Sequence, residues 1–173
     1  MKHLISASLI GVALLGANLG VIAAEKTAQT KAEYNAAKAR AEADYNAARS
    51  QCKSFSGNDR DVCQKQAKAN LTTAKAQAKA AYEGTGEAQL DAREDIIEAD
   101  YKVAKEKCDS LSGDAKDVCV AEAKAMYAKQ EATLEAREDS MGADYKVAKE
   151  RCNTLSGVDR RACLKEAKIK FDD

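Results

Sequence analysis

Three copies of one unit, each with two cysteines, occupy most of this chain and constrain its fold more than any other feature. Each copy begins with Ala-Asp-Tyr, continues through a cysteine, a Ser-Gly pair and a second cysteine, and ends at Ala-Lys. The copies run over residues 43–68, 99–124 and 143–168, so that the offsets between them are 56 and 44 residues. Repeats of this kind are typical of arrays in which small structural units stack on their neighbours.

Every copy carries an apolar stripe whose members follow at steps of 7, 4, 3, 4 and 3 residues. The stripe comprises Tyr34, Ala41, Tyr45, Ala48, Cys52 and Phe55 in the first copy, Leu90, Ile97, Tyr101, Ala104, Cys108 and Leu111 in the second, and Leu134, Met141, Tyr145, Ala148, Cys152 and Leu155 in the third. Because the step of 7 spans two turns, the stripe has a period near 3.5 residues, which marks one face of a helix that packs on another helix. The sequence therefore predicts an all-α fold.

Each stripe ends at a Ser-Gly pair, where we expect the chain to reverse. Gly57, Gly113 and Gly157 can adopt the left-handed conformation that stops a helix. The preceding serine, or the following Asn58, Asp114 or Asp159, can cap the next helix. Each unit is thus predicted to be an αα-hairpin, with helices near residues 26–54, 59–82, 87–110, 115–153 and 160–171. The fourth is long because one unit continues into the next, with Gly142 as a possible break. The hairpins either pack into a bundle or extend as a zigzag.

The six cysteines form three C-x10-C pairs, which are Cys52 with Cys63, Cys108 with Cys119, and Cys152 with Cys163. An even count in an exported chain favours disulfides. On one continuous helix the partners would be about 16 Å apart, whereas a disulfide needs Cα atoms about 4.4–6.8 Å apart. A bend at Ser-Gly brings them together, and each bridge should contribute about 3 kcal/mol.

Other chemistry for these cysteines has weaker support. A thioredoxin-like pair would need C-x-x-C spacing, and a zinc site usually combines closely spaced ligands with histidine. The one histidine is His3, within the expected leader. A metal-binding or thiol-redox protein nevertheless remains an alternative.

The composition favours helices with little core. After residue 24 the chain contains 31 alanines but only 17 Leu, Ile, Val or Phe residues, and it has no proline. Alanine has the highest helix propensity but buries little area. Because 28 basic residues balance 28 acidic ones without a separate basic block, nucleic acid is not an expected partner.

The first 24 residues have the layout of a secretory signal peptide. Lys2 and His3 precede an uncharged stretch over residues 4–22, and cleavage is expected after Ala23 or Ala24. We therefore predict a periplasmic protein with no membrane span after cleavage. The predicted divisions are the signal peptide (1–24), a first hairpin repeat (25–82), a Gly-containing linker (83–87), a second repeat (88–133) and a third repeat (134–173).

Other candidate sites have simpler structural interpretations. Four tyrosines of the stripes (Tyr34, Tyr45, Tyr101 and Tyr145) are expected to pack with their hydroxyl groups in water. Acidic residues at Asp91, Glu94, Asp95 and Glu98, and at Glu135, Glu138 and Asp139, lie beside Arg93 and Arg137 and are expected to form a solvated face rather than a calcium site. A chain without a histidine after the leader offers no Ser-His-Asp or Cys-His arrangement. We expect no catalytic residues, cofactor, metal or small-molecule substrate.

The strings A-D-Y-K-V-A-K-E-K-C-D-S-L-S-G-D-A-K-D-V-C (residues 99–119) and A-D-Y-K-V-A-K-E-R-C-N-T-L-S-G-V-D-R-R-A-C (residues 143–163) resemble repeats in small Ala/Lys-rich exported proteins of proteobacteria, which are described as TolA-like cell-envelope proteins. The resemblance covers about residues 32–170. It implies a periplasmic location and a helical build, and it carries no site residues with it.

These observations favour a non-enzymatic protein of the cell envelope with a structural or protein-interaction role, including a role under stress. We expect a protein partner or self-association. The competing hypotheses are a periplasmic holdase chaperone, which would bind unfolded clients through exposed residues such as Met126, Tyr127 and Met141, and the metal or thiol-redox protein.

Overall fold

The computed structural model describes residues 29–171, which form five α-helices. These are α1 (Lys31–Gln51), α2 (Gly57–Glu83), α3 (Gly86–Cys108), α4 (Gly113–Asn153) and α5 (Gly157–Phe171), and a short 3₁₀ turn (Cys52–Ser54) follows α1. The predicted all-α fold of disulfide-linked hairpins is confirmed. The predicted signal peptide lies outside the described residues. None of the helices described is both long enough and apolar enough to cross a membrane.

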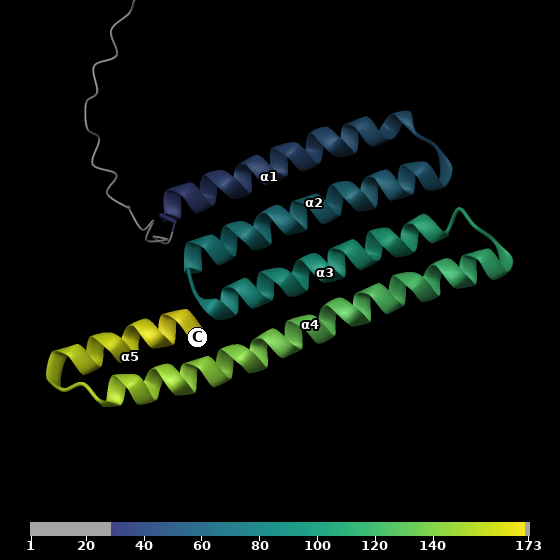
Figure 1. Cartoon of the computed structure of the whole chain (residues 1–173). Coiled ribbons are helices and arrows are strands. Elements are labelled where there is room, and N and C mark those ends of the chain that lie inside the picture. Colours follow the sequence, from purple (N-terminus) through teal and green to yellow (C-terminus); the bar gives the residue numbers. More distant parts are fainter. Residues whose placement is uncertain (1–28, 172–173) are drawn as a thin grey trace, which may run out of the picture.

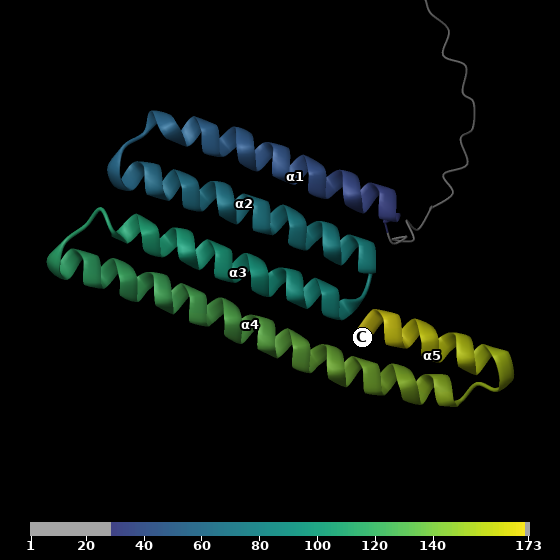
Figure 2. The same cartoon turned by 180° about the vertical axis from the view of Figure 1, so that it is seen from behind.

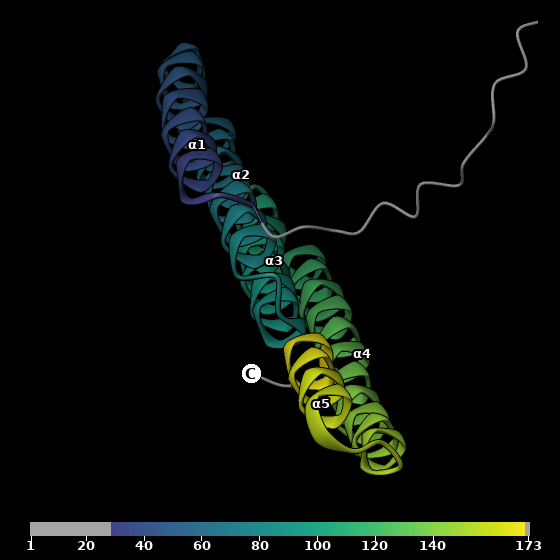
Figure 3. The ribbon, with the colours of Figure 1, turned by 90° about the vertical axis from the view of Figure 1, so that its left-hand side faces the viewer.

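The helices lie side by side in a single layer rather than around a central core. From α1 to α4 each helix runs antiparallel to the one before it (Figure 1). Helix α5 folds back on the second half of α4 and lies in line with α3, beyond the N-terminus of α3 (Figures 1 and 2). The end-on view in Figure 3 shows that the helices form one layer. Two helices, α1 and α4, therefore form the long edges of the layer.

The helix ends follow from short polar signals. Thr30 and Glu33 form a capping box at the start of α1, in which Glu33 Oε2 accepts from the Thr30 backbone N–H at 2.8 Å. The Thr85 hydroxyl accepts from the Ala88 backbone N–H at 3.1 Å and caps α3. Gly84 ends α2 in the left-handed region, at φ 69°. Only Gly84 and Thr85 separate α2 from α3, so the segment expected to be a linker is a tight turn between packed helices.

The three Ser-Gly bends differ from the expectation in one respect. Gly57, Gly113 and Gly157 are left-handed, with φ between 53° and 58°, but each begins the second helix of its hairpin instead of stopping the first. Ser56 and Ser112 occupy the N-cap positions, which is one of the two expected alternatives, but neither makes a side-chain capping hydrogen bond. Helix α4 continues through Gly142 over 41 residues, as expected for a helix shared by two units.

Small residues form the best-packed interface, which lies between α2 and α3. Ala76 and Ala80 of α2 cluster with Ala88 and Ala92 of α3. A second cluster joins Ala69 of α2 to Ala99 and Val103 of α3. Small side chains allow the helix backbones to approach closely, so many weak dispersion contacts replace the large side chains of an ordinary core.

The predicted stripes face neighbouring helices over most of their length. The first five members of each stripe are buried or half-buried, whereas the last members, Phe55, Leu111 and Leu155, are exposed. These three residues come after the end of the helix, where the chain no longer has helical periodicity. The helical pattern therefore holds as far as the first cysteine of each pair. It no longer holds three residues later, at the last member of each stripe.

Candidate functional site

The three disulfides pair the cysteines as the sequence predicts, each across one bend. The Cα atoms are 5.5 Å apart in Cys52–Cys63, 5.7 Å in Cys108–Cys119 and 5.5 Å in Cys152–Cys163. The first cysteine of each pair is fully buried between the helices, and the second is half-buried. In this oxidised state the six sulfur atoms form three separate disulfides, so none of them is a thiolate, the form in which cysteine binds a metal.

A hydroxyl group caps the end of the first helix at every bend. Ser54 donates to the Gln51 carbonyl oxygen at 2.8 Å, Ser110 to that of Lys107 at 3.0 Å, and Thr154 to that of Arg151 at 2.8 Å. These hydrogen bonds go to carbonyl groups at the helix end, which lack the usual N–H donor four residues later. These caps were not among the expected features, although each repeat signals them by a hydroxyl residue two positions after the first cysteine of its pair.

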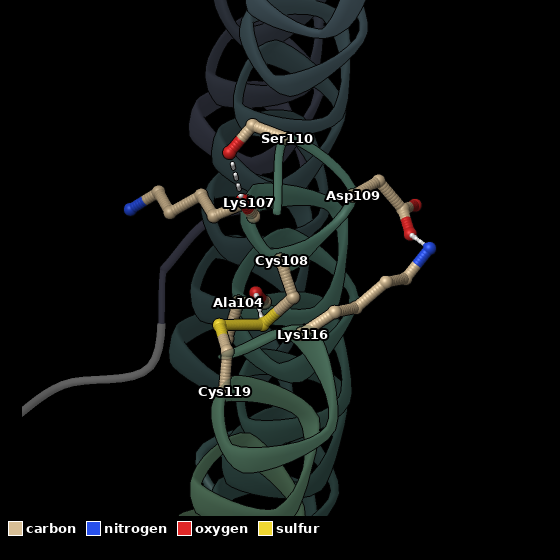
Figure 4. Close-up of a disulfide and its surroundings, with 7 residues drawn as sticks. All are labelled: Ala104, Lys107, Cys108, Asp109, Ser110, Lys116 and Cys119. Atoms are coloured by element: carbon tan, nitrogen blue, oxygen red, sulfur yellow. Dashed lines mark hydrogen bonds and ion pairs between the residues drawn. A yellow bond between two sulfur atoms is a disulfide. The ribbon is translucent and has the colours of Figure 1, made fainter. Parts of the chain in front are cut away.

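A basic residue at one repeat position reaches a different acceptor at each bend. Arg60 donates to the Phe55 carbonyl oxygen at 2.8 Å, and Arg160 donates to Asn153 Oδ1 at 2.8 Å. In the middle bend Lys116 forms an ion pair with Asp109 at 2.8 Å, beside the Cys108–Cys119 bridge (Figure 4). This ion pair lowers the pKa of Asp109 and raises that of Lys116.

The surroundings of the bridges are those of a structural link. Cys108 Sγ lies 3.4 Å from the Ala104 carbonyl oxygen (Figure 4). Since a disulfide sulfur carries no proton, this is a packing contact and not a hydrogen bond. The bends are therefore built to hold two helices together.

An open groove of about 1100 Å³ runs across α2, α3 and α4. Its apolar side chains include Ile96 and Ile97 of α3 and Met126 and Leu134 of α4. The charged residues that line it are all basic: Arg93, Lys129 and Arg137. The remaining lining residues are small or carry an amide or a hydroxyl, and four of them are glutamines: Gln29, Gln77, Gln89 and Gln130. No carboxylate lines this groove, in a chain whose charges otherwise balance.

Two members of the candidate acidic cluster of α3 form ion pairs with lysines. Asp91 lies 3.1 Å from Lys79 of α2, which raises the pKa of the Lys79 ammonium group. Glu98 lies 2.7 Å from Lys102 on its own helix. Among residues 29–171 no three acidic, cysteine or histidine side chains converge as metal ligands would. This arrangement is that of a solvated, charged face.

The stripe tyrosines pack between helices. All four are half-buried. Tyr34 stacks on Tyr82 of α2 with ring centroids 4.9 Å apart, and Tyr101 meets Tyr127 of α4 at 4.7 Å. A hydrogen bond to Glu131, together with nearby carboxylates, raises the pKa of Tyr127 to about 12.

Comparison with known proteins identifies no relative from which a function could be transferred. No family model matches the chain, and no similar curated protein or solved structure was found. A helical build and three C-x10-C disulfides are the features that the structure shares with the TolA-like resemblance. Three disulfides indicate an oxidising, extracytoplasmic compartment.

Proposed function

We propose that this chain is a non-enzymatic, periplasmic protein of the bacterial cell envelope that binds another polypeptide on its helical surface. The observation that carries the proposal is the groove across α2, α3 and α4. Its apolar residues and one-sided basic charge suit an amphipathic segment whose polar side is acidic. The TolA-like resemblance and the leader-like first 24 residues support the location in the periplasm.

The groove offers two kinds of contact to such a segment. Apolar side chains of the partner would cover Ile96, Ile97 and Leu134, which releases water from apolar surface. Carboxylates beside them would meet Arg93 and Arg137, which can form bidentate hydrogen bonds. The three helices that form the groove are held by Ala packing and by the Cys108–Cys119 bridge, so little ordering would accompany binding.

Site-specific photo-crosslinking in the periplasm tests this proposal. A crosslinking residue at Gln130, within the groove, should capture one dominant envelope protein, whereas the same residue at Lys102, outside the groove lining, should not. Arg93→Glu with Arg137→Glu should abolish capture. Arg40→Glu, an exposed arginine of α1, provides the matched control and should leave capture unchanged. Equal capture from Gln130 and Lys102 would argue against the groove as the binding site.

A holdase chaperone is the second candidate, because the layer leaves several large apolar side chains in water. Met126 of α4 is 65% exposed, and Val118 is 57% exposed. A holdase would suppress aggregation of an unfolded client at near-stoichiometric ratios, and in cells it would capture many misfolded exported proteins. A client that aggregates equally with and without the protein would exclude this function.

A further inference from the structure

The outer face of α4 repeats the residues by which α2 and α3 pack on each other. We call this set the outer stripe; it comprises Ala125, Ala132, Ala136, Ala143 and Val147. The offset of 56 residues relates Ala69, Ala76 and Ala80 of α2 to the first three members. The offset of 44 residues relates Ala88, Ala92, Ala99 and Val103 of α3 to the last four. The first half of α4 thus resembles α2, and the second half resembles α3.

Equivalent residues differ sharply in exposure. Val103 is 4% exposed in the interface between α2 and α3, whereas Val147 is 52% exposed. The alanines of the α2–α3 clusters are buried, and those of the outer stripe are exposed. Within the described chain α4 packs only on α3 and α5, and it forms an edge of the layer (Figure 1). A surface that is buried in one copy of the repeat is therefore uncovered in another.

A second copy of the chain supplies the matching surface. When two α4 helices lie antiparallel, the α2-like half of each meets the α3-like half of the other, so the known interface is reproduced twice around a two-fold axis. The cluster of Ala76, Ala80, Ala88 and Ala92 maps onto Ala132 and Ala136 of both copies. The cluster of Ala69, Ala99 and Val103 maps onto Ala125 of one copy with Ala143 and Val147 of the other.

We propose that this protein forms a closed, antiparallel homodimer through the outer stripe of α4, with the two-fold axis between Ala132 and Ala136. The contact would continue the layer across the axis by the same Ala packing that joins α2 to α3. From Val118 to Val147 it would extend over about 44 Å of helix. A helix is only about 10 Å wide, so the interface lies at the small end of specific interfaces. We expect a dissociation constant on the order of micromolar.

One charged position differs between the proposed dimer and the α2–α3 interface that it reproduces. Lys79 and Asp91, which form an ion pair between α2 and α3, both map onto Glu135. In the dimer the two Glu135 carboxylates would therefore face each other near the axis. Like charges weaken association and are screened by salt. Added salt, or Glu135→Gln, should tighten the dimer by about twofold.

An open array through α1 is the competing assembly. Ala32, Ala36, Ala43 and Ala47 on α1 also correspond to the packing residues of α3, and they are exposed. Pairing of this face with α4 of the next molecule would propagate without closing. The α4–α4 contact is favoured because it is longer and because it buries Val147, where α1 has Ala47.

Sedimentation of the full chain with its disulfides intact tests the proposal, which does not depend on the groove. Wild type should sediment as a monomer–dimer equilibrium. Ala132→Glu should yield monomer with unchanged helical circular dichroism, and Ala36→Glu should behave as wild type. Glu135→Gln should tighten the dimer. A wild-type monomer at high concentration, continued growth into larger species that Ala36→Glu stops, or a dimer that survives Ala132→Glu would each overturn the closed dimer.

Discussion

The α2–α3 pair and the α4–α5 pair show two ways of holding helices together in one chain. Two residues connect α2 to α3 without a disulfide, and ten of the fifteen core residues of the described chain belong to these two helices. In contrast, α5 buries only Ala167 and depends on the Cys152–Cys163 bridge. Packing of small residues is therefore enough to hold two helices together where two long faces match. Elsewhere covalent links compensate for the scarcity of large apolar side chains.

Loss of a disulfide should have the largest effect and should depend on position. Replacement of both cysteines by alanine at Cys152 and Cys163 should lower the free energy of unfolding of the α4–α5 hairpin by about 3 kcal/mol. Since α5 has little other packing, hydrogen exchange should show its amides losing protection while those of α2 and α3 keep theirs. The same change at Cys52 and Cys63 serves as the comparison.

Helix α1 packs along α2 over most of its length and has the Tyr34–Tyr82 contact in addition to its bridge. The Cys52/Cys63 double variant should therefore leave α1 partly protected. Full retention of α5 protection in the Cys152/Cys163 variant would contradict the division between packed and linked pairs.

A larger side chain in the α2–α3 interface should have the next largest effect. Ala99 is buried against Ala69 and Val103, so Ala99→Leu should overpack the interface and lower stability by about 1–3 kcal/mol. Its repeat equivalent on α1 is Ala43, which is exposed. Ala43→Leu should change stability by less than about 0.5 kcal/mol. Urea unfolding of the two variants measures the contrast, and equal losses would mean that the α1 edge is covered.

Replacement of glycine by alanine should change stability in opposite directions at two positions. A Cβ at Gly86 would meet the Lys170 carbonyl oxygen at 2.6 Å and would also collide with Met141 Cε, so Gly86→Ala should displace α5 and cost about 1 kcal/mol. A Cβ at Gly142 would have nothing within 4 Å. Gly142→Ala should therefore stabilise α4 by about 1 kcal/mol through helix propensity. Thermal unfolding should show a lower Tm for the first and a higher Tm for the second.

Most of the fold could be predicted because two independent spacings recur in every copy of the repeat. The stripe spacing predicts the helices, and the C-x10-C spacing excludes a straight helix and so predicts the bend and its bridge. These spacings do not predict the backbone conformation within the bends. There the chain places Gly57 at the start of α2, and the serine before it makes no capping hydrogen bond.

The single layer and the groove could not be predicted from the stripes. One stripe predicts one packed face for a helix, but α2 packs on α1 and α3, and α3 packs on α2, α4 and α5. Their second faces consist of alanines such as Ala76 and Ala92, which in sequence look the same as the exposed alanines of α1 and α4. The sequence places Arg93 and Arg137 beside acidic residues, and the structure shows that both also line the groove. Packing decides which alanines are buried, and only the folded chain reveals it.

The smallest expected effect concerns the α3–α4 contact, where Tyr127 packs on Tyr101 and carries a shifted pKa. The hydrogen bond to Glu131 and the negative charge of Glu98 and Glu94 favour the neutral hydroxyl, which raises the pKa of Tyr127 to about 12. Because the folded pKa lies above the ordinary value near 10, the associated stability is fully present below about pH 10 and is lost as the pH rises toward 12. Tyrosinate absorbance should show a phase near pH 12 that is missing in Tyr127→Phe. Glu131→Gln should move that phase toward pH 10, and a titration curve identical to that of wild type would mean that Glu131 does not hold the Tyr127 proton.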